Sequence, residues 1–407
     1  MKRLLLALSL ALVAAPAGAA TLEPPRDWQP PPIERIPNHR QLWRDVLVEL
    51  STYAKGRNKD FIVLAREGVE LLVKGEREAE WEQERDPEGL TFEKRLPLKW
   101  VFRDYVRVLD GMVVDGLYCG PFAFDKPLAE AIKDRKDLDA VLAEERARGI
   151  VRPPVPVPMG PFSIDPKEEL RKHKEWRQKL ERHERQRRVL YAVDAMRANG
   201  RRILSIEDCA SRKEAEAALR ASDRDRVLTF AGAGIGRLDT IPKGFAHREN
   251  AEPVRTVTAA RNWLPMVRGD KYATKAEWLM ALEQTNDDML LIDVAHRGSD
   301  PLTKEEVRRL KFKQLGSARL VLAVLPVGTA HDWRLYWQKG WRAGQPPFLF
   351  APDPDQPGTF YTDLESAEWK QILGKYVAWI VDLGFDGIVF DDLDTYLWFE
   401  ELMPLRN

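Results

Sequence analysis

The sequence has few of the residues that build metal sites or nucleophilic triads. Its 407 residues include 2 cysteines and 6 histidines, with no Cys and His pairs at zinc-ligand spacing. It has no Gly-x-Ser-x-Gly motif. The glycine-rich run at 231–236 lacks the lysine and hydroxyl of a phosphate-binding loop and the spacing of a dinucleotide fingerprint. We therefore expect no metal and no cofactor.

An excess of charge of either sign is also absent. The chain has 64 basic and 64 acidic residues, so its bulk charge favours neither nucleic acid nor a membrane surface. In the densely charged run 167–188, glutamates alternate with arginines at helical spacing, which is typical of a solvated helix with i,i+4 ion pairs. We expect no nucleic-acid partner.

Long apolar runs are missing beyond the first residues. A basic start, an apolar stretch at 4–15 and Ala-Gly-Ala at 17–19 have the pattern of a signal peptide that ends near residue 20. The apolar stretch is too short for a permanent membrane helix, and no later run reaches about 18 apolar residues. We predict an exported protein, periplasmic or extracellular, without stable membrane insertion.

Apolar strands alternate with amphipathic helices through most of the chain. After a proline-rich segment at 21–39, the pattern predicts one domain over 40–407. The predicted strands are 61–64, 112–118, 202–206, 227–230, 262–267, 289–294, 320–325 and 387–390. The predicted helices include 40–55, 213–219, 275–282, 303–310 and 367–383. Eight such units close as a parallel α/β barrel of the TIM type.

An insertion at about 121–190 interrupts this alternation. It contains a proline-rich stretch, 153–166, and the charged helix at 167–188. Cys119 and Cys209 each lie just beyond a predicted strand on either side of it. Export makes a disulfide between them chemically possible, and two buried free thiols are equally compatible with the sequence.

The most informative stretch is 384–396, an apolar strand followed by three closely spaced carboxylates. In α/β barrels the catalytic groups lie where strands end, so Asp391 and Asp394 are candidates for acid, base or nucleophile. Asp392 is expected to point away, because side chains alternate along a strand. The structural alternative is that these carboxylates cap the next helix or bind loop amides.

Together with 320–337, this stretch resembles the extracellular barrel family related to endo-α-1,4-polygalactosaminidases, glycoside hydrolase family 114. Segments 290–294 and 302–307 are similar to the second strand of the family and the helix after it. In the family, segments like 58–72 and 109–118 follow the aspartate-bearing strand, whereas here they precede it. The resemblance therefore implies a circularly permuted barrel, cut after the Asp391 strand.

The resemblance also implies hydrolysis of a polysaccharide by two carboxyl groups. Asp391 matches the strand-end aspartate of the family, and Asp115 aligns with its second carboxylate, a glutamate. Because aspartate is one methylene shorter, this departure bears directly on activity. Glu67 and Glu207 also fall at predicted strand ends and are substitute carboxylates.

Further residues are candidates for substrate binding. Asp293 and Asp394 are interpreted as orienting groups. Aromatic residues near the strand ends are candidates for stacking on sugar faces, with ordinary rim packing as the alternative: Tyr336, Trp337, Trp341, Tyr396 and Trp398. Thr329 stands where the family usually has a glutamate, which weakens attraction to a cationic amino sugar.

Two functions remain open at this point. One is an exported, endo-acting glycoside hydrolase for a polysaccharide, with amino-sugar polymers among the candidate substrates. The other is a non-catalytic polysaccharide-binding or scaffold protein built on the same barrel. The departures at Asp115 and Thr329 fit either function.

Overall fold

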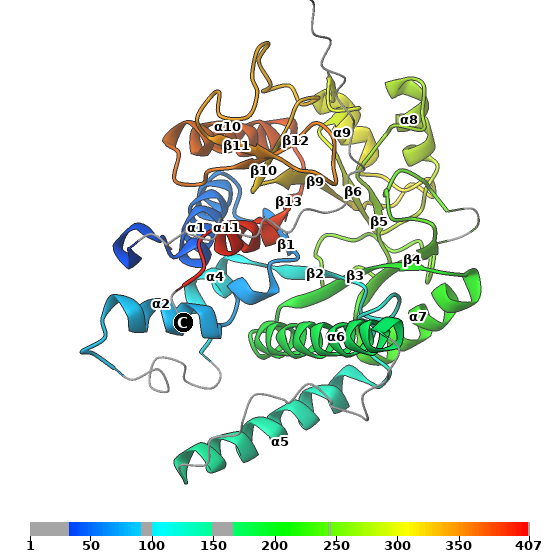
Figure 1. Cartoon of the computed structure of the whole chain (residues 1–407). Coiled ribbons are helices and arrows are strands. Elements are labelled where there is room, and N and C mark those ends of the chain that lie inside the picture. Colours follow the sequence, from blue (N-terminus) through cyan, green and yellow to red (C-terminus); the bar gives the residue numbers. More distant parts are fainter. Residues whose placement is uncertain (1–31, 91–99, 149–165, 243, 245, 406–407) are drawn as a thin grey trace, which may run out of the picture.

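The computed structural model of this chain describes residues 32–90, 100–148, 166–242, 244 and 246–405 (Figure 1). Eight parallel strands form a nearly closed barrel in the order β4-β3-β2-β1-β13-β9-β6-β5, with helices around it. The predicted TIM-type fold is confirmed. The predicted signal peptide, residues 21–31 and most of the proline-rich stretch 153–166 lie outside the described residues.

Each of the eight predicted strands is present in the barrel. Their runs are buried on both faces, as in β9, where all seven residues are buried. The barrel strands are β1 (Ile62–Arg66), β2 (Gly111–Asp115), β3 (Arg202–Cys209), β4 (Leu228–Ala233), β5 (Leu264–Met266), β6 (Met289–Ile292), β9 (Leu320–Pro326) and β13 (Gly387–Asp391). Two small sheets were not predicted, namely β10 (Thr329–His331) with β12 (Thr359–Thr362) and β11 (Leu349–Pro352), and β7 (Ala295–His296) with β8 (Asp300–Pro301).

The outer helices begin at residues suited to cap them. Thr274 and Thr303 form capping boxes at the starts of α8 and α9, and Ser211 and Ser366 cap α7 and α10. The helices are α1 (His39–Arg57), α2 (Glu76–Arg85), α4 (Arg103–Val108), α5 (Leu128–Ala147), α6 (Pro166–Ala198), α7 (Arg212–Asp225), α8 (Lys275–Glu283), α9 (Lys304–Leu310), α10 (Ala367–Leu383) and α11 (Tyr396–Leu402). Short 3-10 helices are η1 (Ile33–Arg35), η2 (Val69–Leu71) and η3 (Leu393–Thr395).

The two ends of the described chain meet on one side of the barrel (Figure 1). β1 pairs with β13 from Ile62 to Ala65, and α1 packs against α10 and α11. Arg40 on α1 donates two hydrogen bonds of 2.9 Å to Glu400 on α11. In the described part of the chain, no strand pairing joins β4 to β5. Strand order follows chain order around the barrel, so it is compatible with the predicted permutation but does not test it.

The insertion forms a helical hairpin against one side of the barrel. α5 and α6 pack together, and the C-terminal part of α6 contacts β2, β3 and η2 (Figure 1). Tyr191 on α6 donates a 2.7 Å hydrogen bond to Asp139 on α5. The predicted charged helix is therefore present, and its second half is attached to the barrel.

A fully buried ion pair lies at the amino ends of the barrel strands. Lys313 Nζ is 2.6 Å from Asp288 Oδ1, and neither side chain is exposed. Lys313 also donates to the carbonyl oxygens of Asn250 and Glu252, at 3.0 and 2.8 Å. Asp288 accepts a 2.7 Å hydrogen bond from the backbone N–H of Arg261. The pair thus connects the segment before β5 to the segments before β6 and β9.

Cys119 and Cys209 form a disulfide across 90 residues, with Cα atoms 5.1 Å apart. It joins the loop after β2 to the end of β3. Because closing a long loop restricts the unfolded chain, we expect the double variant Cys119→Ala/Cys209→Ala to lose about 2–4 kcal/mol of unfolding free energy. Denaturant titration checks this. Reductant should destabilise the wild type equally and leave the variant unchanged; equal stability of the oxidised wild type and the variant would contradict the prediction.

Candidate active site

A pocket of about 630 Å³ opens at the carboxyl ends of the barrel strands. Among its lining are side chains that follow β1, β6, β9 and β13. Six carboxyl groups line it: Glu67, Asp293, Asp353, Asp391, Asp392 and Asp394. Four guanidinium groups line it as well: Arg66, Arg237, Arg268 and Arg334. The strand ends thus create a cavity rich in charged groups, where TIM-type barrels carry their active sites.

Arg66 connects the two predicted catalytic carboxylates. β1 and β13 are neighbours, with Ala65 opposite Phe390, so their last residues Arg66 and Asp391 lie side by side. Arg66 Nη1 is 3.0 Å from Asp391 Oδ2, and Arg66 Nη2 is 2.5 Å from Asp115 Oδ2. Arg66 Nε also donates to Asp115 Oδ1, at 3.3 Å. Asp391 lines the pocket, whereas Asp115 accepts from Arg66 with both oxygens and is not part of the lining.

Glu67 is a carboxyl group near Asp391 whose acidity is strongly changed. Its backbone has a φ of 59°, so the chain turns after β1 and the side chain lines the pocket. Oε1 accepts a 2.8 Å hydrogen bond from the backbone N–H of Asp115. Burial, together with the nearby charges of Asp115 and Asp394, raises the pKa of Glu67 to about 8. The raised pKa of Glu67 favours its protonated form at neutral pH, the form that a proton donor needs.

The insertion reaches this carboxyl group. Arg185 on α6 lies with Nη2 3.3 Å from Glu67 Oε2 and 3.4 Å from the carbonyl oxygen of Asp115. The positive charge of Arg185 lowers the pKa of Glu67, against the larger effect of burial. α6 therefore contributes to the site, which no pattern in the sequence indicated.

Asp392 lines the pocket, so the expectation that it points away is wrong. β13 ends at Asp391, and Asp392 has a φ of 55°, which breaks the alternation of side chains. Thr329 donates a short hydrogen bond to its carboxyl group. Burial and the adjacent Asp391 raise the pKa of Asp392 to about 6.

Two predicted orienting residues line the pocket and already have partners. Asp293 pairs with Arg334 at 2.9 Å, and burial raises the pKa of Asp293. Asp394 accepts a 2.7 Å hydrogen bond from the backbone N–H of Gly68, and burial raises its pKa too. Asp394 therefore also holds the turn that carries Glu67.

Glu207 has a structural position instead. It is fully buried and accepts backbone hydrogen bonds of 2.9–3.0 Å from Leu117, Tyr118 and Cys119. Burial raises its pKa to about 7. It is not part of the pocket lining, and it matches the alternative of a carboxylate that binds loop amides.

Comparison with known proteins shows what the C-terminal part of the chain is similar to. The model of glycoside-hydrolase family GH114 matches residues 256–405. This chain is related to glycoside-hydrolase family GH114. The matched part contains β5, β6, β9 and β13, and hence Asp293, Asp391, Asp392 and Asp394. Arg66, Glu67 and Asp115 come from the other half of the barrel.

Three curated relatives are described as uncharacterized proteins. One from Deinococcus radiodurans is 31% identical over 118 residues, covering 29% of this chain and 37% of the relative. One from Thermotoga maritima is 26% identical over 149 residues, covering 36% and 45%. One from Methanocaldococcus jannaschii is 26% identical over 176 residues, covering 43% and 49%. The chain thus spans less than half the length of these relatives.

The aromatic residues that line the GH114-related pocket differ from most of those predicted. Trp398 lines it as predicted and stacks on Tyr361, with ring centroids 4.5 Å apart, and Trp333 is a further lining ring. Four predicted stacking residues are not part of the lining, namely Tyr336, Trp337, Trp341 and Tyr396. Tyr396 is fully buried against Trp43 of α1. These positions argue against sugar stacking in this pocket by those four residues.

No metal or membrane feature accompanies this site in the described residues. Among them, no group of three or more His, Cys, Asp or Glu side chains is arranged to hold a metal ion. No helix in the described part of the chain is long and apolar enough to cross a bilayer. His331 is buried between Thr329 and Thr359, and burial and Arg334 hold its pKa well below the usual range.

Proposed function

We propose that this chain is an exported glycoside hydrolase that cleaves a polysaccharide within its chain. The observation that carries the proposal is the pair of Asp391 and Glu67 in one GH114-related pocket, the first paired with Arg66 and the second with a pKa of about 8. Glycoside hydrolysis needs one carboxyl group that is protonated and one that is ionised. Different environments for two carboxyl groups favour this division of roles.

In this proposal Asp391 acts on the sugar ring and Glu67 acts on the departing oxygen. Asp391 serves as nucleophile or as base toward water, with Arg66 fixing its position by hydrogen bonds. Glu67 protonates the glycosidic oxygen. Asp115, which aligns with the second carboxylate of the family, positions Arg66 and Glu67 through three hydrogen bonds. Asp115 remains the alternative proton donor.

The substrate we propose is a polysaccharide with neutral or cationic sugars. Asp391 and Asp293 are paired with arginines, which leaves Asp353, Asp392 and Asp394 without a guanidinium from the pocket lining. Asp392 hydrogen-bonds Thr329, so it offsets the loss of the family glutamate at that position. An acidic pocket attracts an amino sugar. Tyr361 and Trp398 offer ring surface for its apolar face.

Release of reducing ends from a panel of polysaccharides tests this function. The panel contains polygalactosamine, its N-acetylated form and polygalacturonate, and product sizes distinguish internal from terminal cleavage. We expect internal cleavage of an amino-sugar polymer. Absence of release from every polymer, with binding retained, would instead support the non-catalytic polysaccharide-binding protein, which the engagement of both Asp115 oxygens by Arg66 favours. Mass spectrometry of the exported chain tests cleavage near residue 20.

Glu67→Gln should remove the basic limb of the pH profile. Because the wild-type acid must be protonated, kcat/KM should fall as pH rises through about 8, the pKa of Glu67. The variant should hydrolyse the natural linkage about 10²–10⁴-fold more slowly, with no basic limb near pH 8. Aryl glycosides with activated leaving groups need less proton donation and should be affected far less.

Asp115→Asn and Asp353→Asn are matched controls for this prediction. Asp353 lines the pocket without contacting Arg66 or Glu67 in the described structure, so its amide variant should keep the wild-type limb. Retention of the limb by Glu67→Gln, with its loss in Asp115→Asn, would assign proton donation to Asp115.

A further inference from the structure

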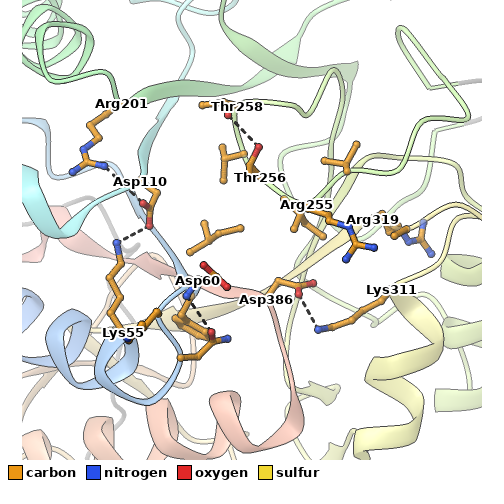
Figure 2. A pocket seen from close by; sticks show the side chains of 18 of the residues that line it. Lys55, Asp60, Asp110, Arg201, Arg255, Thr256, Thr258, Lys311, Arg319 and Asp386 are labelled. Atoms are coloured by element: carbon orange, nitrogen blue, oxygen red, sulfur yellow. Dashed lines mark hydrogen bonds and ion pairs between the residues drawn. The ribbon is translucent and has the colours of Figure 1, made fainter.

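A second and larger hollow, about 920 Å³, lies at the amino ends of the barrel strands, opposite the candidate active site. Seven basic and three acidic side chains line it. In Figure 2, Lys55, Asp110 and Arg201 lie on one side of an open centre, and Arg255, Arg319 and Lys311 lie on the other. A net excess of cations in a concave surface concentrates anions.

Structural roles account for several of these cations. Lys55 pairs with Asp110 and Lys311 pairs with Asp386, each at 2.8 Å. Those two aspartates also accept backbone hydrogen bonds at the starts of β1 and β9. Arg319 donates to the carbonyl oxygens of Leu282, Thr285 and Leu310. These groups hold the amino end of the barrel together.

Other cations at this end have no such role. Within the part of the chain that the structure describes, the side chains of Lys59, Arg202, Arg226 and Arg255 make no hydrogen bond or ion pair. Lys59, Arg226 and Arg255 are exposed, and Arg202 is half-buried. The uncompensated charge therefore belongs to surface that a ligand can reach.

Arg202 lies in an adjoining hollow of about 400 Å³, which shares Arg201 with the larger one. Five arginines and one aspartate line it. The Nε atoms of Arg201 and Arg202 are buried without an acceptor among the described residues, although buried polar groups are normally paired. Burial, and to a smaller extent the nearby positive charges of Arg248 and Arg197, lower the pKa of Arg202.

We propose that these two hollows form one binding site for an acidic polysaccharide, a glycan with carboxylate or phosphate groups along its chain. Their connection at Arg201 suits an extended ligand with several charges better than a single ion. Thr256, Thr258 and Asn58 supply polar groups for sugar hydroxyls. Single-stranded nucleic acid relies on several stacking rings, whereas Phe312 is the exposed ring in the larger lining. This proposal does not rest on the hydrolase activity at the opposite end.

Fluorescence anisotropy with a labelled oligogalacturonate tests the site. Wild-type protein should bind it, should not bind a neutral maltooligosaccharide, and should bind more weakly as salt is raised. Arg202→Gln/Arg255→Gln should raise Kd at least about tenfold, because in this proposal each of the two arginines donates charged hydrogen bonds to the bound glycan. Lys59→Gln/Arg255→Gln changes exposed residues only, so folding is preserved, and it should also raise Kd.

Lys213→Gln/Arg220→Gln is the matched control, since it removes two exposed charges on α7 that line neither hollow. Its Kd should equal that of the wild type. The proposal would be overturned by no binding of oligogalacturonate, or by equal weakening in the control. Tighter binding of a single-stranded oligonucleotide of equal charge, or of phosphatidylglycerol vesicles at equal anion concentration, would overturn it in favour of those ligands.

Discussion

Asp391→Asn should lower kcat/KM for polysaccharide cleavage by at least about 10²-fold while the protein stays folded. The amide cannot act as nucleophile or base, and loss of a positioned acid–base group typically costs about 10²–10⁴-fold. Folding should be preserved because the side chain is at the edge of the barrel and 13% exposed. Reducing-end release, with thermal melting as a check on folding, measures this effect.

The neighbouring carboxyl group provides a demanding control. Asp392→Asn changes the next residue in the same pocket. The amide oxygen of the asparagine can still accept the hydrogen bond from Thr329. We expect it to alter KM more than kcat, since Asp392 contacts neither Arg66 nor Glu67 in the described structure. Wild-type cleavage by Asp391→Asn would contradict the two-carboxylate mechanism. Equal losses of kcat/KM in Asp391→Asn and Asp392→Asn would instead assign catalysis to both carboxyl groups together.

Lys313→Met should cost about 3–5 kcal/mol of unfolding free energy. The substitution leaves the carboxylate of Asp288 fully buried without its ammonium partner, and removal of one member of a buried ion pair has this cost. The loss should appear as a lower midpoint in a urea titration near neutral pH, with an unchanged slope.

Lys311→Met is the matched comparison. Lys311 lies two positions before Lys313 in the sequence and pairs with Asp386, but its side chain is 31% exposed. That variant should lose no more than about 1 kcal/mol. In Lys313→Met/Asp288→Asn, the loss should be smaller than the sum of the single losses, because neither charge remains unpaired. Additive losses would show that the two charges are not coupled.

The barrel was predictable because its strands are apolar on both faces. A continuous apolar run such as 320–325 indicates a strand that is buried on both faces. Capping residues such as Thr303 mark the starts of the helices between strands. The small sheet of β10, β11 and β12 was missed because its strands are three or four residues long, and β11 and β12 are only partly buried. Short segments of this kind gain their order from the loops they contact.

The site was harder to predict than the fold. Asp391 and Asp293 could be placed from strand ends alone. Asp392 could not, because left-handed backbone after β13 reverses the direction that alternation predicts. Arg185 and Tyr396 depend on contacts with distant segments, Glu67 in one case and Trp43 of α1 in the other. No local pattern encodes such contacts, so the sequence alone did not place the insertion relative to the site.

The position of β13 also has a consequence for how the protein is made. Of the eight barrel strands it is the last to leave the ribosome, yet it lies between β9 and β1. Until residues 387–391 arrive, a growing chain holds two partial sheets with unpaired edges at β9 and β1, a state prone to association with other chains. The same five residues bring Asp391. A chain that stops early therefore lacks both the strand that joins the two partial sheets and the proposed catalytic carboxylate. Assembly of the sheet and the capacity for catalysis thus depend on the same late segment.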